Sequence, residues 1–113
     1  MNLKRVVVTG LGALTPIGNT KDEFWDALIS GKSGAAPIIY FDTEKFKTKF
    51  ACELKNFNAT DFLDRKLVNR MDRFTQYAMV ASDEAIVDAK LDLEKVNKLR
   101  VGVIWGAGIG GLE

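Results

Sequence analysis

Two short β-branched runs, each ending in glycines, constrain the fold of this chain more than any other feature. Residues 4–9 read KRVVVT and stop at Gly10, and residues 100–105 read RVGVIW and stop at Gly106. Runs of this length and composition are typical of strands buried in a sheet. Because helical patterns separate the two runs, the sequence predicts an α/β layered domain whose sheet is mostly parallel.

The first helix is predicted to begin directly after Thr20. Residues 20–23 read TKDE, which is a capping box: the Thr hydroxyl and the Glu carboxylate each satisfy a backbone amide that the helix leaves free. Gly31 is expected to end this helix, because glycine reaches the left-handed conformation at little cost. Trp25, on the apolar face of the helix, and Trp105 are both expected in the core.

The second half of the chain predicts one strand and two helical segments. A strand is expected at 49–54, and Thr60 or Asp61 is expected to cap a short helical turn. Asp72 is expected to cap a long helix over 73–90. Its inner stripe is rich in small side chains, which would let a neighbouring helix or sheet approach closely. The stripe consists of Phe74, Tyr77, Ala78, Ala81, Ala85 and Ala89.

The glycine run at the end of the chain raises an alternative, a flavin- or NAD-binding site. Residues 106–111 read GAGIGG, and a strand that runs into GxGxxG suits a dinucleotide pyrophosphate when a helix follows. The helix and the acidic residue expected about 20 positions further on do not follow in this sequence. The earlier run, 8–18, has Pro16 where a helix should form. The favoured interpretation is a turn, with no cofactor.

Charge and residue types narrow the function classes. Sixteen basic and fifteen acidic residues leave a net charge of +1, so neither nucleic acid nor a membrane is an expected partner. The apolar start is too short for a signal peptide, which makes a cytoplasmic location the default. With one cysteine, Cys52, and no histidine, neither a disulfide, a metal site nor a catalytic group is evident. Cys52 is interpreted as a core residue.

Several stretches taken together resemble the β-ketoacyl-acyl-carrier-protein synthases, most closely the elongating KAS II type of bacterial fatty acid synthesis. They are KRVVVTGLGALTPIGNT, LISGKSG, FDTEKFKTKFACELKNFN, DRKLVNRMDRFTQYAMVASDEAIVDA and RVGVIWGAGIGGLE. The resemblance covers all 113 residues. It implies part of the N-terminal half of a thiolase-like layered α-β-α-β-α fold, in which the two predicted strands are neighbours. Residues 1–113 would be an incomplete N-terminal portion of the ketoacyl synthase N-terminal domain, with the remainder of the enzyme absent.

The resemblance also implies an acyltransferase activity. Such a synthase elongates a fatty acyl chain held on an enzyme cysteine by decarboxylative condensation with malonyl on acyl carrier protein. The expected partners are therefore acyl- and malonyl-loaded carrier protein, and the complete enzyme is expected to be a homodimer. The family's nucleophilic cysteine and its two histidines lie beyond Glu113 in chain order. No catalytic residue is therefore expected in this chain, which is predicted to be inactive by itself.

Two features of the family can be placed on residues of this chain. Ile109, flanked by Gly108 and Gly110, corresponds to the residue that gates chain length at the far end of the acyl pocket. The basic cluster corresponds to the surface that receives carrier protein, although Asn69 is neutral where a basic residue is common. The cluster consists of Arg65, Lys66, Arg70 and Arg73.

Ordinary alternatives stay open for both features. Ile109 is a buried turn residue in the simplest interpretation, and the basic cluster is a solvated helix surface. A third class of function is a self-contained interaction module that kept this sequence but lost the chemistry. That would require residues 1–113 to fold without the further strands of the sheet.

Overall fold

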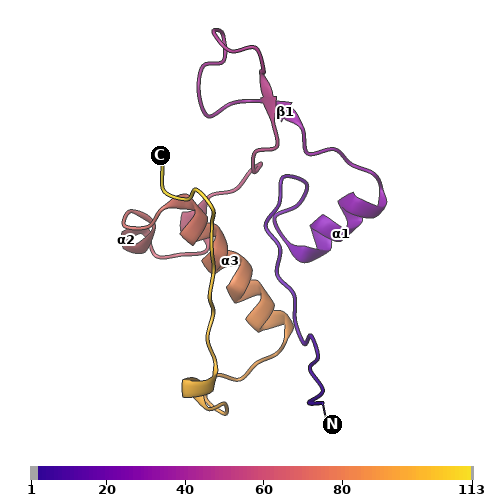
Figure 1. Ribbon diagram of the computed structural model, residues 1–113, viewed down its shortest axis with the longest axis vertical. Helices are drawn as coiled ribbons and strands as arrows, with labels where there is room; N and C mark the ends of the chain where they lie inside the picture. The colour runs from indigo at the N-terminus through magenta and orange to yellow at the C-terminus, as the bar shows by residue number, and fades with distance from the viewer. Residues whose placement is uncertain (1–2, 113) are drawn as a thin grey trace.

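The structure is a computed structural model that describes residues 3–112. Along the chain it contains α1 (Lys21–Ile29), β1 (Ala36–Pro37), β2 (Phe50–Ala51), α2 (Arg65–Val68) and α3 (Arg73–Asp88). Two 3-10 turns, η1 (Ala59–Asp61) and η2 (Lys98–Arg100), complete the regular structure. Strands β1 and β2 pair antiparallel, with Ala36 opposite Ala51. Figure 1 shows this hairpin at one end of the molecule and α3 nearer the other.

Helix α1 begins and ends as the sequence predicts. The Thr20 hydroxyl accepts the N–H of Glu23 at 3.2 Å. The Glu23 carboxylate accepts the N–H of Asn19 at 2.7 Å, rather than that of Thr20, so the capping box is shifted by one residue. At the other end Gly31 has a φ of +69°. Lys32 donates its N–H to Ala27 at 2.9 Å and Gly31 to Leu28 at 3.1 Å, which is a Schellman motif.

The small residues of α3 permit the close approach that the sequence predicts. The segment before α1 crosses α3 with glycine backbone directly against the helix. A Cβ added at Gly12 would collide with the carbonyl oxygen of Ala81, and one added at Gly10 with the carbonyl oxygen of Ala85. The glycines of the first run therefore serve backbone packing against a helix.

The two predicted strands do not form a sheet within residues 3–112. Residues 4–9 and 100–105 contribute to no strand there, and the one named sheet of the described range is the β1–β2 pair. The expectation that these segments pair as neighbours is therefore wrong for this structure. A strand forms by pairing with a neighbouring strand, and within residues 3–112 neither segment has such a neighbour. Val6 and Ile104 consequently stay exposed, at 88% and 100%.

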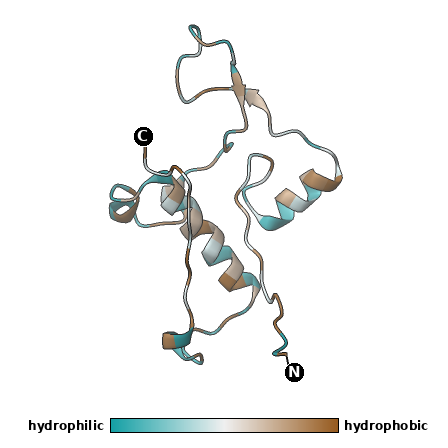
Figure 2. Ribbon diagram, in the orientation of Figure 1, coloured by the Kyte–Doolittle hydropathy of each residue, from teal (hydrophilic) through white to brown (hydrophobic). Residues whose placement is uncertain are grey.

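The core is small for the length of the chain. Its buried apolar residues are Ala27, Ala59, Leu63, Ala78, Val80 and Ala81. The radius of gyration is 17.3 Å, whereas a compact chain of this length would have about 13 Å. Trp25 and Trp105 are 59% and 54% exposed, so the expectation that they lie in the core is wrong. Figure 2 shows hydrophobic residues along the segment before α1 and on α1 itself, and large apolar residues in both places are exposed.

The predicted caps of the second half are partly shifted. Asn58 caps η1 and Asp64 caps α2, in place of Thr60 or Asp61. Asp72 stands at the N-cap of α3 as predicted, but its carboxylate makes no capping hydrogen bond. The strand expected at 49–54 is reduced to β2.

Candidate functional site

The basic cluster spans α2 and the turn into α3, and this segment is held in place by side-chain bonds to its backbone. Asp64 Oδ1 accepts the N–H of Lys66 at 2.8 Å. Gln76, on α3, donates from Nε2 to the carbonyl oxygens of Val68 at 3.0 Å and Met71 at 2.9 Å. These two carbonyls lie at the end of α2 and just before α3. One glutamine side chain therefore fixes the junction that carries the cluster.

The four cations of the cluster fall into two settings. Arg65, Lys66 and Arg70 are exposed, and within residues 3–112 no carboxylate forms an ion pair with them. Arg73 lies instead with its guanidinium carbon 4.5 Å from the centre of the Tyr40 ring, a cation–π contact. The structure thus presents three of the predicted residues on an open surface and engages the fourth with an aromatic ring.

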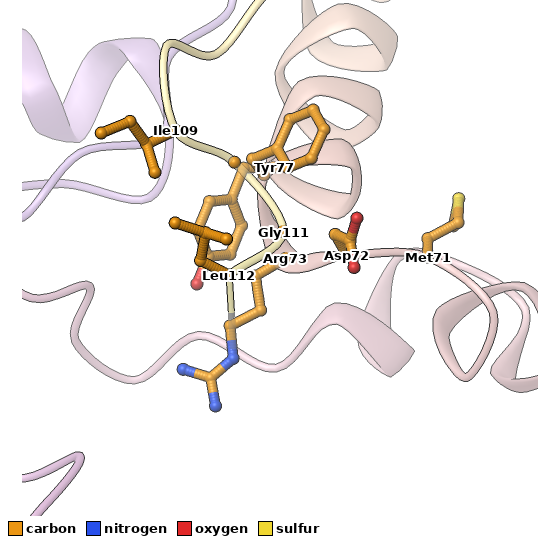
Figure 3. A pocket seen from close by; sticks show the side chains of 9 residues that line it. Met71, Asp72, Arg73, Tyr77, Ile109, Gly111 and Leu112 are labelled. Atoms are coloured by element: carbon orange, nitrogen blue, oxygen red, sulfur yellow. The ribbon is translucent and has the colours of Figure 1, made fainter.

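The glycine run meets the start of α3 and encloses a hollow with it. The hollow has a volume of about 400 Å³. Figure 3 shows the turn carrying Ile109, Gly111 and Leu112 passing the first residues of α3. The lining consists of Met71, Asp72, Arg73, Phe74, Tyr77, Ile109, Gly110, Gly111 and Leu112. Ile109 and the beginning of α3 therefore share one cavity, although the sequence places them far apart.

The glycines on the two sides of Ile109 have different surroundings. A Cβ added at Gly110 would lie 2.6 Å from Cδ1 of Phe74. Gly111 has a φ of +77°, and a Cβ there would lie 2.6 Å from Oδ2 of Asp72. A Cβ added at Gly108 would meet no atom within 4 Å. Ile109 itself is 81% exposed, so in residues 3–112 it is not the buried turn residue of the simplest interpretation.

Two carboxylates on α3, which the sequence interpretation missed, hold the segment before α1 in place. Glu84 accepts the N–H of Ala13 through Oε2 and the N–H of Lys21 through Oε1, each at 2.8 Å. Asp88 accepts the N–H of Leu11 at 3.0 Å and lies 3.3 Å from the ammonium of Lys21. The available signal was their spacing, since both positions fall beside the small-residue stripe of α3.

These contacts shift two pKa values. The N–H of Leu11, followed by the ammonium of Lys21, lowers the pKa of Asp88 below its usual value. The carboxylates of Asp22 and then Asp88 raise the pKa of Lys21. Both shifts favour the charged forms, so the pair is held ionised around neutral pH.

The catalytic groups of a condensing enzyme are not evident in this part of the chain. Cys52 is a free cysteine and is exposed, so its interpretation as a core residue is wrong. The sequence has no histidine to stand beside it. Among residues 3–112, no helix has the length and hydropathy needed to cross a membrane.

Comparison with known families gives a match along nearly the whole chain. The family described as "Beta-ketoacyl synthase, N-terminal domain" matches residues 3–113. A 3-oxoacyl-[acyl-carrier-protein] synthase 2 from Synechocystis sp. is 53% identical over 97% of this chain. The protein of the same name from Staphylococcus aureus strain COL is 51% identical over 97% of the chain. The chain spans about a quarter of these relatives, 26% and 27% of their lengths.

Solved structures agree on the fold. The ishigamide ketosynthase/chain length factor matches 80% of this chain with a TM-score of 0.73 and 37% identity, over 22% of its own length. A type II polyketide acyl-carrier protein in complex with its ketosynthase gives a TM-score of 0.59 at 23% identity, over 80% of this chain and 23% of the other. The predicted α/β class, as part of a thiolase-like fold, is confirmed by these neighbours. The nucleotide-binding alternative gains no support from any of them.

Proposed function

Because this chain belongs to the β-ketoacyl synthase N-terminal domain family, we propose that it is the N-terminal portion of an elongating β-ketoacyl-acyl-carrier-protein synthase of the KAS II type. The observation that carries the proposal is the 53% identity with a 3-oxoacyl-[acyl-carrier-protein] synthase 2 over 97% of the chain. The reaction joins an acyl group held on an enzyme cysteine to malonyl carried on acyl carrier protein. Carbon dioxide leaves the malonyl group, a carbon–carbon bond forms, and the thioester bond to the enzyme breaks.

The residues that perform this chemistry are proposed to lie outside residues 1–113. A condensing cysteine must be a reactive thiolate, and the family's histidines act on the malonyl group and the developing enolate. Cys52 has no histidine in the sequence to serve it. The segment would therefore supply scaffold, pocket wall and docking surface, and would not condense acyl chains alone.

Ile109 is proposed to gate the far end of the acyl pocket, close to the dimer interface of a homodimeric enzyme. Its branched side chain would have to turn aside before a long acyl chain enters. Two observations support this role: within residues 3–112 Ile109 is 81% exposed, and it lines a hollow of about 400 Å³. Gly108 and Gly110 border the moving residue.

The exposed cations are proposed to receive acyl- or malonyl-loaded carrier protein. Arg65, Lys66 and Arg70 lie unpaired on one short segment in the described part of the chain. Complementary charge speeds encounter and fixes orientation more than it adds affinity. Arg73 is included in this surface, although its guanidinium also packs on Tyr40. The cytoplasmic location stays a prediction.

The proposal is tested by assaying a full-length protein that carries this segment beside purified 1–113. The full-length protein should release carbon dioxide and form β-ketoacyl product from acyl- and malonyl-carrier protein. The 113-residue chain should form none. Product from the short chain, or none from the long one with both substrates loaded, contradicts the proposal.

A further inference from the structure

We infer that Phe74 is a positioning residue for the turn that carries Ile109, and through that turn a determinant of acyl chain length. The inference rests on the proposed role of Ile109 as a gate. It concerns a residue on α3 that touches the turn and is far from it in sequence.

The contact lies between the Phe74 ring and the backbone of Gly110. A Cβ at Gly110 would lie 2.6 Å from Cδ1 and 2.8 Å from Cε1 of the ring. Real Cβ atoms do not approach other atoms so closely, so the ring occupies the space that a side chain at 110 would need. At the next residue, Gly111, φ is +77° and an added Cβ would lie equally close to the carboxylate of Asp72. The start of α3 therefore fits the glycine backbone and excludes other residues.

The part of α3 that carries the Phe74 ring is held in place by several contacts. Phe74 lies in the first turn of α3, whose approach is held by the two bonds from Gln76 to the carbonyls of Val68 and Met71. One turn further on, Tyr77 packs edge-to-face on Phe57 with ring centres 5.6 Å apart. A ring held in this way sets the position of the backbone that lies against it.

Ile109 depends on that backbone for its position. Within residues 3–112 Ile109 is 81% exposed, so little packing in the described range holds it directly. On one side Gly110 is seated against Phe74, and on the other a Cβ at Gly108 would meet no atom within 4 Å. The turn thus has a fixed side and an open side, as a hinged gate requires. Figure 3 shows Ile109 extending away from the start of α3.

The first test replaces Phe74 in the full-length synthase and measures kcat/KM for long and short acyl-carrier substrates. Phe74→Ala removes the ring that contacts the Gly110 backbone, so the turn should open more easily to long acyl chains. The ratio of long-chain to short-chain kcat/KM should therefore rise about two- to tenfold, which corresponds to one aromatic contact. The matched control is Phe46→Ala, an exposed aromatic that packs on Phe41 in the loop between β1 and β2. It should leave the ratio unchanged.

The second test measures coupling and does not depend on Phe74→Ala folding. Gly110→Ala places a methyl group against the ring and should displace the turn, which changes the ratio. Phe74→Leu added to Gly110→Ala should return the ratio toward the native value, because the smaller side chain leaves room. Independent effects of the two substitutions on the ratio overturn the inference.

Ile109→Phe, measured in the same assay, separates the two proposals. If it alters chain-length preference while Phe74→Ala and Gly110→Ala both keep the native ratio, Phe74 does not position the gate and the gate itself stands. If full-length protein with native residues forms no condensation product, the proposed function has failed and the inference falls with it.

Discussion

Oε1 of Glu84, on α3, lies 2.8 Å from the backbone nitrogen of Lys21, the first residue of α1. One helix thus satisfies a free amide at the start of another. The other carboxylate oxygen accepts the N–H of Ala13 at 2.8 Å, so one side chain ties α1, the loop before it and α3 together.

Glu84→Gln should destabilise a full-length protein carrying this segment by about 1–3 kcal/mol, because charge-assisted bonds are among the stronger ones. The amide can accept only through its oxygen, and its NH₂ group would face the second N–H donor. Urea denaturation measures the loss. Asp83→Asn is the matched control, because Asp83 is the exposed neighbour of Glu84 and makes no such bond in the described range. Equal stability of the two variants contradicts the role given to Glu84.

Asp88 should make stability depend on acid pH. Its folded pKa is lowered, chiefly by the N–H of Leu11 and then by Lys21. A lowered carboxyl pKa contributes stability that is fully present above the unfolded value of about 3.9, and this is lost as pH falls through the folded value. Asp88→Asn should therefore cost stability at pH 7 and flatten the decline below about pH 4. Thermal unfolding of both proteins is measured from pH 7 to pH 2.5. If the variant loses stability below about pH 4 as steeply as the native protein does, the result argues against the contact.

Gly12→Ala should be more costly than Gly31→Ala. At Gly12 the new methyl group collides with the carbonyl oxygen of Ala81, a backbone atom that cannot move without shifting α3. At Gly31 φ is +69° and nothing lies within 4 Å, so the cost is conformational, about 1–2 kcal/mol. Gly12→Ala should exceed that, toward the upper part of the roughly 1–3 kcal/mol typical of overpacking. The two variants are compared by denaturant midpoint, and the reverse order would exclude a packing role for Gly12.

Charge reversal at Lys66 and Arg70 should slow acyl transfer from carrier protein. Each reversal replaces attraction by repulsion at a rim site, so the second-order rate should fall by about tenfold or more at low ionic strength. The difference should shrink as salt is added, because the Debye length falls from about 30 Å at 0.01 M to about 10 Å at 0.1 M. Lys95→Glu, on the segment between α3 and η2, provides a charge-matched control. The measurement is the stopped-flow rate of acyl transfer at several salt concentrations. Equal rates for all variants at low salt would refute docking of carrier protein at Lys66 and Arg70.

The sequence predicts correctly those features that depend on interactions between residues close together in the chain. Thr20, Gly31 and the small residues of α3 act within or directly beside their own helices, and the structure places them as predicted. The two strand runs failed because pairing depends on segments that residues 3–112 do not bring alongside them. The contacts of Glu84 and Phe74 were missed because each acts on backbone far away in sequence, and the helical stripe that includes Phe74 does not indicate such a contact.

The most direct test of the central claim, that the final glycine run borders an acyl pocket and not a nucleotide, is the acyl-length profile of Ile109→Phe in the full-length synthase. The larger side chain should close the far end of the pocket, so kcat/KM should fall for long acyl substrates and hold for short ones. A profile identical to that of the native enzyme across all chain lengths would contradict the claim.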